Sequence, residues 1–291
     1  MTYRIVHKTT YNYKTPVSIG NHVAYLTPRL RDGQVCTSHE LMVTPMPSVV
    51  SKWSDFFGNP VHLFSVQEPH SELTVEARSL VSVTSDPAPW PETSMPWDDV
   101  VRRLAIDLSP EALDARQFVF ESPRITPGAD FALYASQSFP RGRGLAEAVS
   151  DLTERIYKEF RFDSSTTNVR TSPEEVLLQR SGVCQDFAHL QVACLRSLGL
   201  AARYVSGYLR TLPPPGRPRL IGADASHAWV SVYCPNIGWL DVDPTNNLIP
   251  TDSHVTLAWG RDYSDLSPVR GVILGGREHK LDVGVDMEPL G

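Results

Sequence analysis

Cysteine is scarce in this sequence. Four cysteines occur in 291 residues, at positions 36, 184, 194 and 234, and no two of them form a CxxC pair. So few thiols argue against a disulfide framework and against a structural zinc site. Each thiol therefore has to be judged by its own surroundings.

Long apolar runs and basic clusters are also missing. No run approaches the roughly 18 apolar residues that a membrane-spanning helix needs. Residues 1–8 contain no apolar core of signal-peptide length. The net charge is −6, and no basic cluster interleaved with aromatic residues occurs. We therefore expect a cytoplasmic protein that binds neither membrane nor nucleic acid.

What the sequence does contain is a soluble globular composition, 41% hydrophobic and 21% charged. Residues 1–85 are typical of an all-β, sandwich-like domain, because segments such as 3–11 and 72–78 alternate polar and apolar residues. Residues 55–62 contain Gly and Asn and are expected to turn between two strands.

The pattern changes at residue 86. Residues 86–91 hold three prolines within five positions, which marks a boundary. Residues 86–143 are predicted to form a linker with short helices at 97–106 and 110–118. Residues 144–291 are predicted to form an α+β core with C-terminal strands, in which helices at 145–160 and 184–198 precede strands at 203–209 and 227–233.

Cys184 lies where a loop turns into an amphipathic helix. Free N–H groups and the helix dipole at such a position favour the thiolate. Gly182 just before it allows the backbone to approach a ligand closely. Cys184 also belongs to the apolar stripe of its helix, so a small buried side chain without chemistry is the alternative. Cys194, in mid-helix, fits that alternative well.

A thiol nucleophile needs a histidine. His189 follows Cys184 by five residues and is rotated about 140° around the helix, so it is not the partner. His227 opens a strand in which it shares a face with Trp229, Ser231 and Tyr233.

The next strand supplies a carboxylate. If Tyr233 pairs with Trp239, Asp243 lies one diagonal away from His227, within reach of the two side chains. Asp241 shares the face but lies further away, and a register slip of one residue would undo the argument. A thiol on a helix start, with a His and an Asp on adjacent strands, matches a Cys-His-Asp triad. Outside these three residues no grouping has metal-ligand spacing, so we expect no metal and no cofactor.

Four motifs in this region resemble those of bacterial transglutaminase-like proteins. They are GVCQDFAHL at 182–190, ARYVSGY at 202–208, ASHAWV at 225–230 and GWLDVDPTNN at 238–247. The resemblance implies a papain-like transglutaminase core over about residues 145–250, preceded by the β domain found in this group. It also implies that Cys184 is the nucleophile, His227 the base and Asp243, rather than Asp241, the orienting carboxylate.

Three residues and one segment near the predicted triad are further candidates for the site. Gln185, Trp229 and Trp239 are candidates for substrate binding or for the oxyanion site. The proline-rich segment 212–219 is a candidate rim of the substrate site.

The resemblance implies acyl transfer from a carboxamide or peptide bond of a peptide or protein substrate through a thioester. We expect hydrolysis, as in a peptidase or amidase, because amines compete poorly with water unless the pocket excludes it. The alternative within the same chemistry is a transglutaminase that joins glutamine side chains to amines. The alternative of another class is a non-catalytic peptide-binding module on the same fold.

Overall fold

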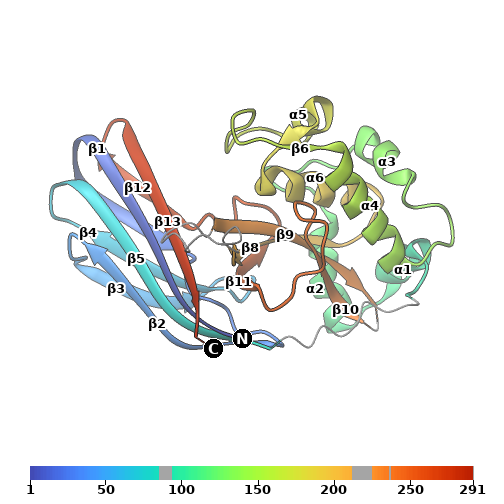
Figure 1. Ribbon diagram of the computed structural model, residues 1–291, viewed down its shortest axis with the longest axis horizontal. Coiled ribbons are helices and arrows are strands. Elements are labelled where there is room, and N and C mark those ends of the chain that lie inside the picture. The colour runs from blue at the N-terminus through green and yellow to red at the C-terminus, as the bar shows by residue number, and fades with distance from the viewer. Residues whose placement is uncertain (85–93, 212–224, 236, 291) are drawn as a thin grey trace, which may run out of the picture.

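The computed structural model describes residues 1–84, 94–211, 225–235 and 237–290 (Figure 1). The proline-rich segments at 86–91 and 212–219 lie outside the described residues. The strands are β1 (Thr2–Ala24), β2 (Gln34–Thr44), β3 (Val49–Ser54), β4 (Pro60–Val66), β5 (His70–Val83), β6 (Arg161–Phe162), β7 (Ser181–Gly182), β8 (Ala202–Leu209), β9 (Ala225–Cys234), β10 (Gly238–Val242), β11 (His254–Gly260), β12 (Val269–Gly275) and β13 (His279–Pro289). The helices are α1 (Trp97–Ile106), α2 (Pro110–Arg116), the 3₁₀ turn η1 (Gln117–Val119), α3 (Ala129–Ser136), α4 (Leu145–Glu159), α5 (Pro173–Gln179) and α6 (Cys184–Ser197).

The N-terminal part is all β, as predicted. Its strands pair into one seven-stranded sheet of order β2-β5-β1-β4-β3, with β12 and β13 also paired to β1. Where a sandwich of two sheets was expected, the strands pair into one sheet, and β1, 23 residues long, runs through it. A local apolar core that includes Val17, Phe64 and Leu73 is buried within this part.

The last two strands belong to this sheet by their hydrogen bonds. β13 pairs with β1 from Tyr3↔Pro289 to Tyr13↔His279, and β12 pairs with β1 from Val17↔Gly275 onward. Figure 1 shows these red strands beside the blue β1, with the two chain ends close together. The sequence placed residues 144–291 in the core, whereas the pairing returns residues 269–289 to the N-terminal sheet. Such pairing covers an edge of β1 that would otherwise expose unpaired backbone groups.

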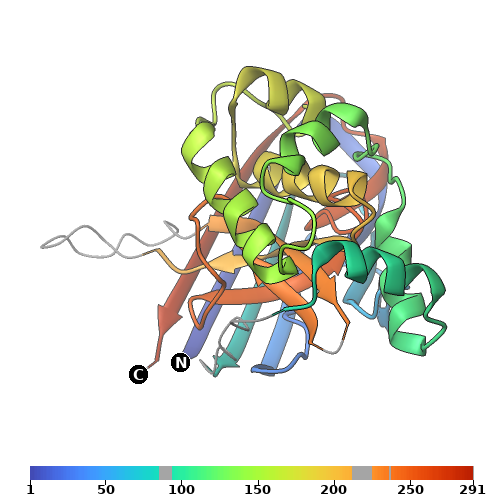
Figure 2. The ribbon, with the colours of Figure 1, turned by 90° about the vertical axis from the view of Figure 1, so that its right-hand side faces the viewer.

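The second part is a mixed α and β core. A four-stranded antiparallel sheet of order β10-β9-β8-β11 packs against α6, and Figure 2 shows the helices gathered over this side of the molecule. Ala228, Val230 and Val232 of β9 join α6 residues in the main apolar core. Among the described residues, no helix is long and apolar enough to cross a membrane.

Local sequence signals are confirmed at several element ends. The predicted helix at 97–106 is α1. Ser172 caps α5 in a capping box with Glu175, and Pro173 is the first helical residue. Gly199 has φ of 82° just after α6, the left-handed conformation that a helix-ending glycine adopts at low cost.

Two amide side chains dock the N-terminal part onto β11. Gln34 accepts from the N–H of Thr256 at 2.7 Å and donates to its carbonyl at 2.8 Å. Asn59 pairs in the same way with the N–H and carbonyl of Trp259, at 3.0 and 2.8 Å. The two contacts flank an irregularity in the β11–β8 pairing. This docking brings the two parts of the chain together beside the hairpin that carries His227.

Candidate active site

The start of α6 is built around Cys184, its first residue. The Asp186 carboxylate accepts the backbone N–H of Val183 at 2.8 Å and the hydroxyl of Thr167 at 2.7 Å. Gly182 packs so closely on Asp186 that an added Cβ would lie 2.8 Å from its Cβ. Gly182 thus serves close packing inside the turn, whereas the sequence suggested the approach of a ligand.

The β9–β10 hairpin has the register that the sequence argument required. Tyr233 pairs with Trp239, and Asp241 pairs with Ser231, without a shift. Asp243 follows directly after β10, and its side chain reaches His227. The Nε2–H of His227 donates to Asp243 Oδ2 at 2.7 Å.

The Asp243 carboxylate is fully buried and receives several donors. Oδ1 accepts the backbone N–H groups of Thr245 and Asn246 at 2.9 and 3.2 Å. Oδ2 accepts from His227, from the Asn246 side chain at 2.8 Å and from His254 Nε2 at 3.2 Å. A buried carboxylate with this many donors is held in one orientation.

These contacts set the charges of the pair. Burial by itself would raise the pKa of Asp243, but hydrogen bonds from His227 and His254 hold it well below its ordinary value. Burial would lower the pKa of His227, yet hydrogen bonds with Asp243 and with Cys184 outweigh burial and raise it to about 10. His227 is therefore an imidazolium beside a carboxylate at neutral pH.

The third member of the group is the thiol. The Cys184 side chain lies close enough to His227 to interact with it and to raise its pKa. Since Nε2 of His227 is bonded to Asp243, Nδ1 is the ring nitrogen left for the thiol. The structure thus brings Cys184, His227 and Asp243 into one chain of contacts.

The other cysteines have a different environment. All four thiols are free, and burial raises the pKa of Cys36, Cys194 and Cys234. Cys194 is fully buried in the main core, as expected from its place in mid-helix.

The fold around these residues is shared with known proteins. Residues 3–82 match the Bacterial transglutaminase-like N-terminal region, and residues 136–244 match the Transglutaminase-like superfamily. An uncharacterized protein of Mycobacterium tuberculosis is 41% identical over 99% of this chain and 93% of its own length. The chain belongs to the bacterial transglutaminase-like family.

Two further proteins are similar to this transglutaminase-like protein. A solved structure from Cytophaga hutchinsonii, described as a candidate cysteine protease, aligns with TM-score 0.75 and 23% identity, over 99% of this chain and 90% of that one. It shows the same fold. A protein-glutamine gamma-glutamyltransferase of Pseudomonas aeruginosa is 42% identical over 72 residues, which are 24% of this chain and 11% of that protein.

The other predicted site residues lie around the three. Gln185 is half-buried in the first turn of α6. Trp229 is fully buried, and its ring lies 6.2 Å from that of His227. Trp239 is half-buried between the rings of Phe118 and Tyr233.

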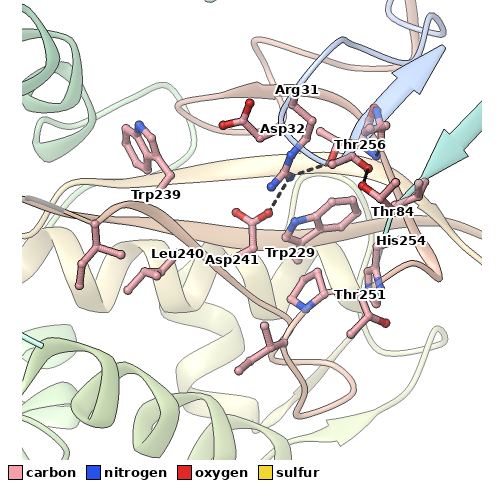
Figure 3. Close-up of a pocket in the computed structure, with 16 residues that line it drawn as sticks. Arg31, Asp32, Thr84, Trp229, Trp239, Leu240, Asp241, Thr251, His254 and Thr256 are labelled. Atoms are coloured by element: carbon pink, nitrogen blue, oxygen red, sulfur yellow. Dashed lines mark hydrogen bonds and ion pairs between the residues drawn. The ribbon is translucent and has the colours of Figure 1, made fainter. Parts of the chain in front are cut away.

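Both tryptophans line a pocket of about 380 Å³ between the two parts of the chain (Figure 3). Its walls come from residues 31–34 of the N-terminal part and from β9, β10 and β11. Asp241 lies in this wall and accepts from Arg31 at 2.7 Å, which Figure 3 marks as a dashed line. The two aspartates of the hairpin are thus separated: Asp243 bonds to His227, and Asp241 to the loop of the N-terminal part.

His254 is the residue that the sequence argument missed. It opens β11, lines the pocket in Figure 3 and donates to Asp243. The available signal was a histidine at the start of a strand, the same signal that identified His227. One ring nitrogen each of His227 and His254 and one carboxylate oxygen of Asp243 lie within 4.8 Å of one another, and atoms of these types can bind a metal ion. Hydrogen bonds hold these three together.

Proposed function

We propose that this protein is a cysteine-nucleophile enzyme that cleaves amides through a thioester, with Cys184, His227 and Asp243 as its triad. The supporting observation is the arrangement of His227, which contacts Cys184 on one side and donates to Asp243 at 2.7 Å on the other. Family membership supports the same chemistry.

The reaction follows from these contacts. The Cys184 thiolate attacks the carbonyl carbon of a carboxamide or peptide bond and forms a tetrahedral oxyanion. The backbone N–H of Cys184, at the start of α6, is the first donor to that oxygen. The C–N bond then breaks, and His227 gives its proton to the leaving nitrogen. Asp243 stays ionised and keeps the ring oriented.

The thioester is resolved by water or by an amine. We propose hydrolysis of a peptide or protein substrate as the main outcome, because amines compete poorly with water unless the acyl pocket excludes it. Attack by water yields a carboxylic acid and returns the thiol. The Pseudomonas relative supports the alternative, in which a lysine-like amine attacks and a new amide forms.

One experiment separates the two outcomes. The protein is incubated with a glutamine-containing peptide and a labelled primary amine, and mass spectrometry follows deamidation, backbone cleavage and amine incorporation. We expect acid products in excess of amine adducts, and no product with Cys184→Ala. Amine incorporation above hydrolysis would instead establish a transglutaminase.

A second experiment tests the nucleophile without a substrate. Iodoacetamide at pH 7 is expected to modify Cys184 faster than the half-buried Cys36, because Cys184 lies beside the proposed base His227, whereas burial raises the pKa of Cys36. The Cys184→Ala variant reports the background rate of the other three thiols. If Cys184 reacts no faster than Cys36, the protein is a binding module on this fold rather than an enzyme.

A further inference from the structure

Two histidines from different strands share one oxygen of Asp243. His227 on β9 lies 2.7 Å from Oδ2, and His254 on β11 lies 3.2 Å from the same atom. An ionised carboxylate only accepts hydrogen bonds, so each Nε2 is a donor. The proposed function uses the first of these bonds and leaves the second without a role.

The ring of His254 is itself fixed. Its side chain is 2% exposed, and its edge-to-face contact with Trp229 has a centroid separation of 5.3 Å. Nε2 donates to Asp243, and Nδ1 forms a hydrogen bond with the Ser253 hydroxyl at 3.3 Å. The backbone N–H of His254 donates to the Thr251 carbonyl at 3.1 Å. One orientation therefore satisfies both ring nitrogens.

The remaining donors to the carboxylate are less protected. The Asn246 side chain also donates to Oδ2, but Asn246 is exposed, and water competes for its amide. Thr245 and Asn246 hold only Oδ1 through their backbone N–H groups. His254 is thus the buried donor, besides His227 itself, that opposes rotation of Oδ2.

We propose that His254 is a positioning residue that fixes the Asp243 carboxylate in the orientation His227 requires. It acts through Asp243 on His227, and through His227 on the contact with Cys184. This inference rests on the proposed function, since it concerns the same triad.

The test compares three variants. His254→Phe keeps a flat ring and removes the donor, whereas His254→Gln offers an amide N–H near the position of Nε2. His7→Phe is the matched control, because His7 is equally buried and bonds to Tyr208 and Thr9 away from Asp243.

Two readouts need no substrate: the rate of Cys184 alkylation by iodoacetamide at pH 7, and the downfield proton NMR signal of His227 Nε2–H. We expect His254→Phe to slow alkylation of Cys184 about tenfold, because the Asp243 carboxylate and the His227 ring lose their fixed orientation. The NMR signal of His227 Nε2–H should broaden. His254→Gln should recover the rate to within about threefold and restore the signal, and His7→Phe should retain both.

Several outcomes would overturn the proposal. An alkylation rate in His254→Phe equal to or above that of the native protein would mean that Asp243 keeps its orientation without His254. If alkylation of Cys184 slowed as much in His254→Gln as in His254→Phe, the donor at this position would not be what matters, and the proposal would fail. Failure of the proposed function gives a different result, because Cys184 of the native protein would then react no faster than Cys36.

A further variant covers the case in which His254→Phe does not fold. His254→Ala leaves a gap in the wall of the 380 Å³ pocket, which is large enough to admit imidazole. Added imidazole should restore alkylation of Cys184, and added cyclopentane, which has no donor, should not. Equal rates with and without imidazole would reject the positioning role.

Discussion

Two buried histidines of this protein, one at the start of β9 and one in the middle of α6, have opposite electrostatics. His227 is 7% exposed and His189 1%. Burial lowers the pKa of both, yet the pKa of His227 is raised to about 10 and that of His189 is lowered to about 3. The partner atoms account for the difference. Asp243 accepts a hydrogen bond from His227, whereas the backbone N–H of Tyr263 donates to Nε2 of His189 at 3.1 Å and occupies its lone pair.

Burial alone therefore does not decide whether a histidine is charged. The hydrogen bonds and charges of Asp243 and Cys184 together raise the pKa of His227 more than burial lowers it. The hydrogen bond that Tyr263 donates to His189 favours the neutral ring, as burial does. The position of each histidine in the fold decides which hydrogen-bond partner its ring contacts. His227 lies near the start of β9 and meets Asp243, which directly follows β10, whereas His189 lies in mid-helix and packs on Tyr204 at 4.9 Å.

The largest expected effect separates the two histidines directly. His227→Gln removes the base, and we expect amide cleavage to fall about 1,000-fold or more. His189→Gln should lower the melting temperature but leave the rate per folded molecule within about threefold, since it changes packing and the hydrogen bond from Tyr263, both outside the proposed triad. Turnover of a peptide substrate and thermal unfolding are measured for both. Similar losses in turnover would contradict the comparison.

The next effect concerns the acceptor. Asp243→Asn replaces a carboxylate with a neutral amide whose NH₂ group can donate. The amide no longer stabilises the charged His227 ring or keeps a proton on Nε2, so we expect turnover to fall about 100-fold or more. Asp241→Asn is the matched control on the same hairpin, because Asp241 pairs with Arg31 instead. The control should retain turnover. Equal losses would show that the hairpin, rather than the one carboxylate, matters.

The two histidines should also give opposite pH dependence of stability. The folded pKa of His227 lies above the ordinary value of 6.5, so its contribution is complete below pH 6.5 and is lost as the pH rises toward about 10. The folded pKa of His189 lies below 6.5, so its contribution is complete above pH 6.5 and is lost as the pH falls toward about 3. Urea unfolding across this range should show a weaker alkaline loss in His227→Gln and a weaker acid loss in His189→Gln. Unchanged slopes in either variant would refute the assignment for that residue.

The smallest effect on chemistry is expected at the docking contacts. Gln34→Ala removes two buried hydrogen bonds to Thr256 and should cost about 1–3 kcal/mol of unfolding free energy. The charge of His227 depends on its own hairpin, so its imidazole titration by NMR should stay the same. Asn59→Ala is the parallel variant on Trp259. A shifted titration in both would mean that the N-terminal part sets the charge of His227.

Much of the fold could be predicted from short-range signals. The capping box at Ser172, the glycine that ends α6 and the alternation in β1 each depend on neighbours in sequence, and each is confirmed. The hairpin register could also be predicted, because the turn between Cys234 and Gly238 fixes it. The return of β12 and β13 to β1 could not, because that pairing joins residues that are 245 or more positions apart.

The same division applies to the candidate site. Cys184, His227 and Asp243 could be proposed from the chain alone, since element starts and strand alternation are local properties, and the family motifs selected Asp243 over Asp241. Only the tertiary structure decided how their charges are held. His254 reaches Asp243 from β11, and Arg31 engages Asp241 across 210 positions, because folding brings side chains together through packing that no sequence spacing encodes.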